Sequence, residues 1–540
     1  MSHTDQAPGS THAGGGETTS RTFFGHPWGL ANLFGVEMWE RFSFYGLQGL
    51  VLFYLYHSTD DGGLGMSESL ATSIVGAYGG AVFLASIGGA WISDRVLGAE
   101  KTLFYSAVLI MLGHMSLALL PGFTGLIIGL VLVAVGSGAL KTANSAMVGT
   151  LYEEGDPKRD GGFSLFYMGV NIGALIGPLV TGALWKQMGF HWGFGAAAVG
   201  MALGLIQYIL MRKTTLQNAG AKAPNPLRPE ERVKSWGGVI ALTAIVVGLA
   251  LLFPTSQLST YVAVIAIIAA VYFWQEMYRS SLVNRTERHR LLGFIPMFLA
   301  ACVFWSIYQQ QFTMVAMYAD KKLNLSWGFM DTPASWVQSI NPIFIILLAP
   351  LFTILWDRLG TRQPSTPVKF GVSAIMLGLG LVPFLFFVSY ADHSTPYYMI
   401  IVVLFLFTVS ELLLSPVGLS MSTKLAPRAY PARMVAMWNL TSAVGTALAG
   451  TLAGFYNPES AHDSTIYFIT MICVCVVIGL IILGVSKPIV KLFDGVKQGR
   501  RHRGSFSSMW CRGSPLPNGG VHEPSPSLSC EPPLFWQLLH

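Results

Sequence analysis

Long apolar runs recur along almost the whole chain and are separated by short polar segments. A run of about 18 or more apolar residues is long enough to cross a bilayer as a helix. The pattern predicts fourteen membrane-spanning helices. Their approximate limits are 28–57, 70–93, 102–120, 125–150, 162–185, 193–211, 236–253, 259–278, 292–318, 333–356, 368–390, 396–423, 432–455 and 465–486.

The composition of the 540-residue chain agrees with this pattern. Charged residues make up 11% and hydrophobic residues 52%, with a mean hydropathy of +0.53, whereas a soluble protein carries about 25% charged residues. The fold class is therefore all-α, in a polytopic membrane protein. Five cysteines show no metal-ligand spacing, so we expect no metal and no cofactor.

The distribution of basic residues predicts the orientation. With both termini inside, only Lys186, Lys321 and Lys322 fall in outer loops, while Arg41 and Lys141 lie within spans. The other 28 of the 33 basic residues fall on the inner side, which is a strong positive-inside pattern. The net charge of +6 therefore reflects membrane topology and does not indicate a nucleic-acid partner.

The spans fall into groups of six, two and six, because proline-rich and charged loops separate them. Two six-helix halves with a binding site between them are typical of major facilitator transporters. The expected domains are a disordered tail (1–22), an N-terminal six-helix bundle (23–212), a cytoplasmic loop (213–235), an inserted and lipid-facing two-helix hairpin (236–279), a C-terminal six-helix bundle (280–490) and a disordered or non-native tail (491–540).

Five charged residues lie inside the predicted spans: Glu37, Glu40, Arg41, Lys141 and Glu411. Each costs roughly 2.5–3.5 kcal/mol in hydrocarbon, so such residues face an interior cavity and usually carry function. The first three follow an i, i+3, i+4 spacing, which places them on one helix face. The alternative is a static group of ion pairs that holds helices together.

Four motifs surround these charges. They are Glu37-x2-Glu40-Arg41-Phe42-x-Phe44-Tyr45-Gly46, Gly136-x-Gly138-x2-Lys141, Phe166-Tyr167-x3-Asn171-x-Gly173 and Ser410-Glu411-x3-Ser415-Pro416-x-Gly418. Together they closely resemble the signatures of the proton-dependent oligopeptide transporter family of the major facilitator superfamily, bacterial type. The resemblance implies a monomeric symporter, not an enzyme, that imports di- and tripeptides with protons by alternating access across the inner membrane, with both termini cytoplasmic.

A further motif follows the second span. It reads Gly88-Gly89-x4-Asp94-Arg95-x2-Gly98-x2-Lys101 and resembles the cytoplasmic loop signature of the superfamily. The resemblance implies that Asp94 and Arg95 bind across a helix end and lock one conformation. The alternative is a charged loop that only ends a membrane span.

A peptide is a zwitterion, so its site needs cations at one end and an anion at the other. We expect Arg41 and Lys141 to bind the peptide carboxylate and Glu411 to bind the ammonium. The resemblance adds neutral residues to this site, although each aromatic one could instead pack against lipid or the core. They are Tyr45, Tyr78, Asn171, Trp305, Asn341, Ser415 and Trp438.

Proton coupling needs a group whose protonation changes an ion pair. Glu37 and Glu40 are the predicted proton carriers, and Lys141 would pair with an ionised carboxylate and be released when it is protonated. Gln48 and Gln309 stand where relatives often carry charges. A contact between two glutamines can still close this outer gate but cannot titrate, so the gate is excluded as a proton site. His114 stands alone, and we expect a hydrogen-bonded core residue.

Three other functions are alternatives to peptide transport. A carrier of nitrate or another small anion would use Arg41 and Lys141 but would leave Glu411 as a buried repulsive charge. An intramembrane enzyme would need a nucleophile or metal ligands, and the chain contains neither HExxH nor GxSxG. A non-transporting sensor stays open, and a flux assay would separate it from a carrier.

Overall fold

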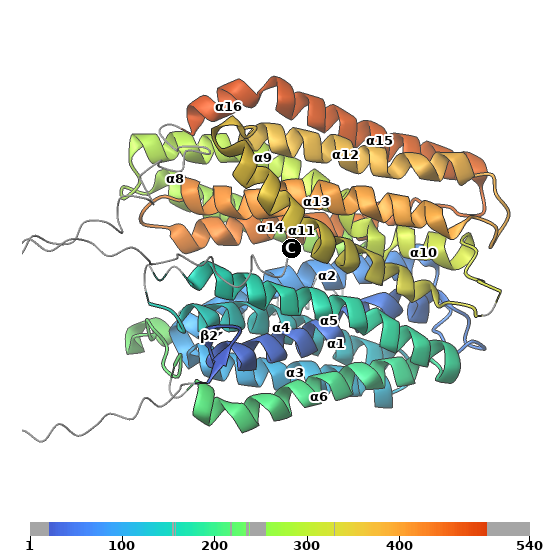
Figure 1. The fold of residues 1–540 in the computed structure, drawn as a ribbon, viewed down its shortest axis with the longest axis horizontal. Coiled ribbons are helices and arrows are strands. Elements are labelled where there is room, and N and C mark those ends of the chain that lie inside the picture. Colours follow the sequence, from blue (N-terminus) through green and yellow to red (C-terminus); the bar gives the residue numbers. More distant parts are fainter. Residues whose placement is uncertain are drawn as a thin grey trace, which may run out of the picture.

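The computed structural model describes residues 21–153, 156, 158–216, 219–233, 237, 255–328 and 330–493 (Figure 1). This part of the chain is almost entirely helical, which confirms the predicted all-α membrane fold. The predicted span at 236–253 and most of both predicted tails lie outside the described residues. The predicted domain boundaries stay a prediction.

The N-terminal half begins with a short antiparallel strand pair and continues with six long helices. These elements are β1 (Thr22–Phe23), β2 (His26–Pro27), α1 (Gly29–Tyr56), α2 (Glu68–Ile92), the π-helix η1 (Ser93–Leu97), α3 (Ala99–Leu119), α4 (Gly122–Gly149), α5 (Arg159–Met188) and α6 (Phe190–Thr215).

The remaining described elements are also helices. They are η2 (Thr255–Gln257), α8 (Leu258–Arg279), α9 (Arg285–Tyr308), η3 (Gln309–Phe312), α10 (Met314–Lys321), η4 (Ala334–Ser339), α11 (Ile340–Leu359), η5 (Gly360–Arg362), α12 (Thr366–Phe387), α13 (Tyr397–Leu425), α14 (Pro431–Ala453), α15 (Ala461–Gly484) and α16 (Ser486–Leu492).

Helices occupy thirteen of the fourteen predicted spans, and the ninth span is divided into α9, η3 and α10. Eleven described segments are long and apolar enough to cross a membrane by length and composition. The helices α1 and α14 are not among them, because α1 carries three charges and α14 is rich in small and polar residues. Most residues of both helices are buried by their neighbours in the bundles.

The chain forms two packed groups of helices, α1–α6 below and α9–α15 above in Figure 1. Their most extensive contact is between α2 and α14. Glycines allow this approach: a Cβ on Gly76 would lie only 2.6 Å from the Cα of Gly450. Small residues at such a crossing let two membrane helices pack backbone to backbone.

Helix α8 lies beside this crossing and packs against both α2 and α14. Its Ser259 Oγ lies 3.2 Å from Ser73 Oγ of α2 and 2.8 Å from Thr451 Oγ1 of α14. The outward side chains Ile268 and Tyr272 are exposed. Helix α8 therefore leaves one apolar face exposed and joins the two bundles with the other, while the lipid-facing insertion stays a prediction.

The two ends of the bundles differ in charge. We call the end with Arg95, Arg279 and Lys424 the basic end (left in Figure 1) and the other the far end. At the far end, Asp320 Oδ2 of α10 accepts a hydrogen bond from Tyr56 Oη at 2.5 Å and lies 2.9 Å from His57 Nε2. Lys321 pairs with Glu68 at the start of α2, and these contacts hold the bundles together there.

The loop motif at the basic end is held by the segment that follows α6. The carbonyl oxygens of Asp94 and Arg95 accept hydrogen bonds from the backbone of Asn225 and Leu227, each at 3.0 Å. Arg95 Nη2 also lies 2.6 Å from Glu231 Oε2. In this conformation the motif ties α2 to the segment after α6, while the Asp94 side chain is exposed.

Candidate functional site

The predicted charge cluster lies on one face of α1, buried among the helices of the N-terminal bundle. Arg41 Nε lies 3.0 Å from Glu37 Oε1 and 2.7 Å from Glu40 Oε2. Glu40 is fully buried, and Arg41 is 6% exposed. Helix α5 comes close to α1 at this level because Gly173 has no side chain. A Cβ at this position would lie 2.3 Å from the carbonyl oxygen of Met38.

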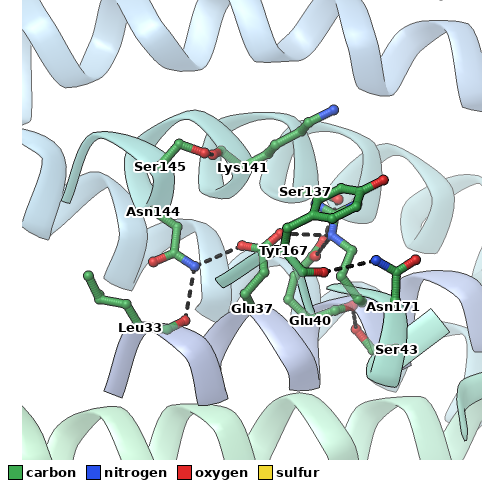
Figure 2. Close-up of polar contacts among 11 residues, drawn as sticks. Leu33, Glu37, Glu40, Ser43, Ser137, Lys141, Asn144, Ser145, Tyr167 and Asn171 are labelled. Atoms are coloured by element: carbon green, nitrogen blue, oxygen red, sulfur yellow. Dashed lines mark hydrogen bonds and ion pairs between the residues drawn. The ribbon is translucent and has the colours of Figure 1, made fainter. Parts of the chain in front are cut away.

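Helix α4 supplies a hydrogen-bond donor to each carboxylate (Figure 2). Ser137 Oγ donates to Glu40 Oε1 at 2.5 Å, and Asn144 Nδ2 donates to Glu37 Oε2 at 2.8 Å. The sequence analysis missed both residues. Their signal was present, since Ser137 and Asn144 lie four residues before and three residues after Lys141 and so share its helix face.

Lys141 does not pair with Glu37 or Glu40 in this conformation. Its Nζ lies 4.9 Å from the centre of the Phe83 ring, and its side chain extends away from Glu37 in Figure 2. It forms no ion pair within the described ranges. In place of Lys141, the side chains of Arg41, Ser137 and Asn144 contact the two carboxylates.

Arg41 keeps hydrogen-bonding capacity for another group. Its Nε is used by the two glutamates, but its Nη2 is buried without a hydrogen-bond partner among the described residues. The Cζ of Arg41 lies 5.4 Å from the centre of the Phe44 ring. An unused guanidinium donor in a buried position is costly unless an acceptor reaches it.

A second polar group lies in the C-terminal bundle. Tyr308 Oη donates a hydrogen bond to Glu411 Oε2 of α13. Asn341 Nδ2 donates to Tyr308 Oη at 3.0 Å and to Thr408 Oγ1 at 2.9 Å. Within the described part of the chain Glu411 has no cationic partner. Tyr308, which the sequence analysis missed, therefore orients this carboxylate.

Tyr45 lies between the two groups. Its ring centre is 6.1 Å from that of Phe312 in η3, so it reaches across from α1 to the C-terminal bundle. Its ring centre also lies 5.2 Å from that of Phe44, whose ring lies under the Arg41 guanidinium. Among the described residues, the N-terminal bundle thus carries a cation with a free donor, and the C-terminal bundle carries a carboxylate without a cationic partner.

The predicted aromatic residues differ in their surroundings. Tyr78 stacks with Phe44 at 6.2 Å between ring centres, and its hydroxyl is buried without a partner among the described residues. Trp305 Nε1 is also buried and without a partner there. Trp438 instead packs closely over Gly418, where a Cβ would lie 2.0 Å from its ring. Trp438 therefore helps α14 to pack against α13.

Three other predicted site residues are polar and lie on α5, α11 and α13. Asn171 Nδ2 of α5 donates to the carbonyl oxygen of Tyr167 at 3.0 Å (Figure 2). Ser415 lies one helical turn after Glu411 on α13 and is half-buried. Asn341 is 7% exposed and belongs to the Tyr308–Glu411 group. Asn341 and Ser415 therefore lie beside the Tyr308–Glu411 group, whereas Asn171 lies on α5, which packs against the helix of the N-terminal charge cluster.

Two polar contacts suggested by the sequence are not made among the described residues, one between Gln48 and Gln309 and one to His114. Gln309 Nε2 donates to Thr446 Oγ1 of its own bundle at 3.0 Å, and Gln48 Oε1 is buried without a partner in the described chain, so the glutamine contact is not made. Both ring nitrogens of His114 are likewise buried without a described partner. The neighbouring Gly113 packs closely against Val133 of α4, where a Cβ would lie 2.7 Å from the valine side chain.

Comparison with known proteins gives a consistent family. The model of the POT family (PTR2) matches residues 100–469. An uncharacterized transporter of Bacillus subtilis (strain 168) is 42% identical over 479 residues, which cover 88% of this chain and 96% of that protein. A di-/tripeptide transporter of Lactococcus lactis subsp. cremoris is 37% identical over 497 residues, covering 89% and 99% of the two chains.

A solved structure shares the fold over nearly its whole length. It is the crystal structure of a mutant of the peptide transporter POT in complex with alafosfalin. The two chains are 41% identical, with a TM-score of 0.83, and the match covers 88% of this chain and 98% of the other.

Proposed function

Because the chain belongs to the POT family, we propose that it is a proton-coupled symporter that imports di- and tripeptides by alternating access. The observation that carries this proposal is the pair of opposite charges on the two bundles. Arg41 has a buried donor without a partner, and Glu411 is a carboxylate without a cationic partner, both among the described residues. A peptide zwitterion supplies the missing acceptor at one end and the missing cation at the other.

The peptide carboxylate is assigned to Arg41 and Lys141. Arg41 offers Nη2, and Lys141 carries an ammonium that pairs with none of the described carboxylates. Charge-assisted hydrogen bonds of this kind are about twice as strong as neutral ones. The ammonium is assigned to Glu411, which Tyr308 holds in place. Asn171, Asn341 and the aromatic residues then surround the peptide between its ends.

The proton is assigned to the Glu37/Glu40 pair. Both carboxylates share the single Arg41 guanidinium, so its one positive charge balances only one of the two negative charges when both are ionised. Protonation of one carboxylate restores the charge balance and leaves Arg41 freer for the peptide. Lys141 is the responding partner: it pairs with an ionised carboxylate once the substrate has left.

Alternating access requires the far end to open. The contacts of Asp320 with Tyr56 and His57, and of Lys321 with Glu68, join the bundles there, so they must break in the outward-open state. By the positive-inside pattern the basic end is cytoplasmic, as are both termini. We place the protein in the inner membrane as a monomeric functional unit.

The direct test is uptake of a labelled dialanine into liposomes that contain the purified protein. We expect accumulation only with an inward proton gradient, and competition by unlabelled di- and tripeptides. Absence of both accumulation and counterflow would reject peptide transport. The same liposomes with labelled nitrate test the anion alternative, which no observation on this chain favours.

Replacing Asp320 with alanine is expected to favour the state that is open at the far end. The change removes the acceptor of Tyr56 and His57, and such bonds to a charged group contribute about 1.5 kcal/mol or more, which is about a tenfold shift in population. Spin labels at the exposed positions Thr59 and Ser394 would report longer distances in a cysteine-free background.

The matched control is Asp392→Ala at the same end. Lys322 Nζ lies 2.5 Å from Asp392 Oδ1 and holds the pKa of Asp392 below its usual range, but the pair does not cross between the bundles. This variant should leave the label distances unchanged. Equal behaviour of the two variants would show that Asp320 does not hold the far end closed.

Replacing Tyr308 with phenylalanine is expected to weaken dipeptide binding about fivefold, by about 1 kcal/mol. The ring remains, but Glu411 loses its donor and Asn341 loses an acceptor. Binding is measured by competition for labelled dialanine. Tyr467→Phe is the control, because Tyr467 donates to Gln310 in the same bundle. A larger loss in the control would contradict the assigned role of Tyr308.

A further inference from the structure

A cavity of about 230 Å³ lies at the basic end of the C-terminal bundle, apart from the peptide site. The basic-end halves of α11, α12 and α13 surround it, together with Phe493 after α16. Two of its polar lining residues are the lysines Lys369 and Lys424, and Trp356 and Gln363 lie beside them. None of these residues contributes to the proposed transport cycle.

Both lysines line the same cavity, and among the described residues neither has an acidic partner. Lys369 is only 8% exposed, and its Nζ lies 3.8 Å from the centre of the Trp356 ring and 3.0 Å from Gln363 Oε1. Lys424 of α13 lines the same cavity. Neither ammonium pairs with a carboxylate in the part of the chain that the structure describes, whereas Lys321 and Lys322 at the far end both do.

The position of Lys369 in its helix adds to this positive charge. It lies in the first turn of α12, and Thr366, the first residue of that helix, also lines the cavity. The N-terminus of a helix carries a partial positive charge, so a cation there is unfavourable and an anion favourable. The N-cap residue Ser365 gives this helix no side-chain cap.

A buried cation, a second cation and a helix N-terminus therefore meet at one cavity. These positive charges repel one another, and together they suit a group with several negatively charged oxygen atoms. The apolar residues Val417, Leu425 and Phe493 complete the lining. Basic pockets between membrane helices on the basic side of the bilayer are typical sites for lipid headgroups.

We propose that this cavity binds a phosphate group, which Lys369 and Lys424 hold against the N-terminus of α12. An anionic phospholipid headgroup and free inorganic phosphate share this chemistry. Phosphatidylcholine also carries a phosphate, but its quaternary ammonium is repelled by the two lysines. Anionic lipid therefore binds more tightly than phosphatidylcholine if the headgroup is the source.

The test compares the full-length protein with the double variant Lys369→Gln/Lys424→Gln. Native mass spectrometry measures retention of phosphatidylglycerol or phosphatidylcholine, and thermal denaturation measures protection by each lipid and by inorganic phosphate. The control, Lys213→Gln/Lys487→Gln, removes the same charge from exposed positions at the basic end. We expect affinity for phosphatidylglycerol to fall at least about tenfold in the double variant and to stay unchanged in the control.

A second variant keeps the test independent of folding. Lys424→Glu changes an exposed residue and supplies Lys369 with a counter-ion, so the protein should be stable without ligand and bind phosphate groups poorly. Protection by inorganic phosphate alone, lost in both variants, would assign the site to free phosphate. Binding that is equal in the wild type and both variants, or no binding of either ligand, would overturn the proposal.

Discussion

Replacing Glu40 with glutamine is expected to abolish proton-driven accumulation of peptide while peptide exchange continues. Glu40 is fully buried, pairs with Arg41 at 2.7 Å and accepts a hydrogen bond from Ser137. Glutamine keeps the size and the acceptor oxygen but cannot bind and release a proton. Exchange needs only alternating access with peptide bound, so it does not require this step.

The expected size of the effect follows from the driving force. A neutral zwitterion that moves with one proton carries one charge, worth about 2.3 kcal/mol at 100 mV, which supports about 50-fold accumulation. With the Glu40→Gln variant, the peptide concentration inside the liposomes should not rise above the concentration outside. It is measured under a potassium-diffusion potential. Counterflow of labelled dialanine, measured in the same liposomes without a gradient, should stay within about threefold of the wild type.

The matched control is Ser137→Ala. It removes the hydrogen bond to Glu40 but keeps the titratable carboxylate, so gradient-driven uptake should persist. Accumulation by Glu40→Gln at the wild-type level would assign the proton elsewhere, with Glu37 the next residue to test. If the variant lost stability together with both modes of transport, the cluster would be a static group of ion pairs.

The sequence was sufficient to predict most of the fold, because apolar runs in a membrane protein must satisfy every backbone group within a helix. It was also sufficient to identify Glu37, Glu40 and Arg41, since charges within apolar spans are costly and their spacing determines a common helix face. The structure confirms that these three side chains meet.

Contacts between helices could not be predicted in the same way. Ser137 and Asn144 are common residue types, and only the packing of α4 against α1 shows that they bind the two carboxylates. The hydrogen bond of Gln309 to Thr446, rather than to Gln48, likewise depends on the rotation of one helix relative to another.

Neutralising the carboxylate in the C-terminal bundle, by Glu411→Gln, is expected to weaken dipeptide binding at least about 30-fold. Truncating one partner of a buried, hydrogen-bonded charge pair costs about 2–5 kcal/mol, much of it from the charge left without a partner. Here that charge is the peptide ammonium. Glutamine can still accept the hydrogen bond of Tyr308, so the local packing of α13 should persist.

A ligand without the ammonium separates the proposed contact from an indirect effect. A des-amino analogue of dialanine should bind the wild type far more weakly than dialanine does, and Glu411→Gln should hardly change its affinity further. The difference between the two losses is the coupling energy of Glu411 and the ammonium. Equal losses for both ligands would show that Glu411 acts on the site as a whole. The ammonium would then need another partner, and the assignment of opposite peptide ends to the two bundles would fail.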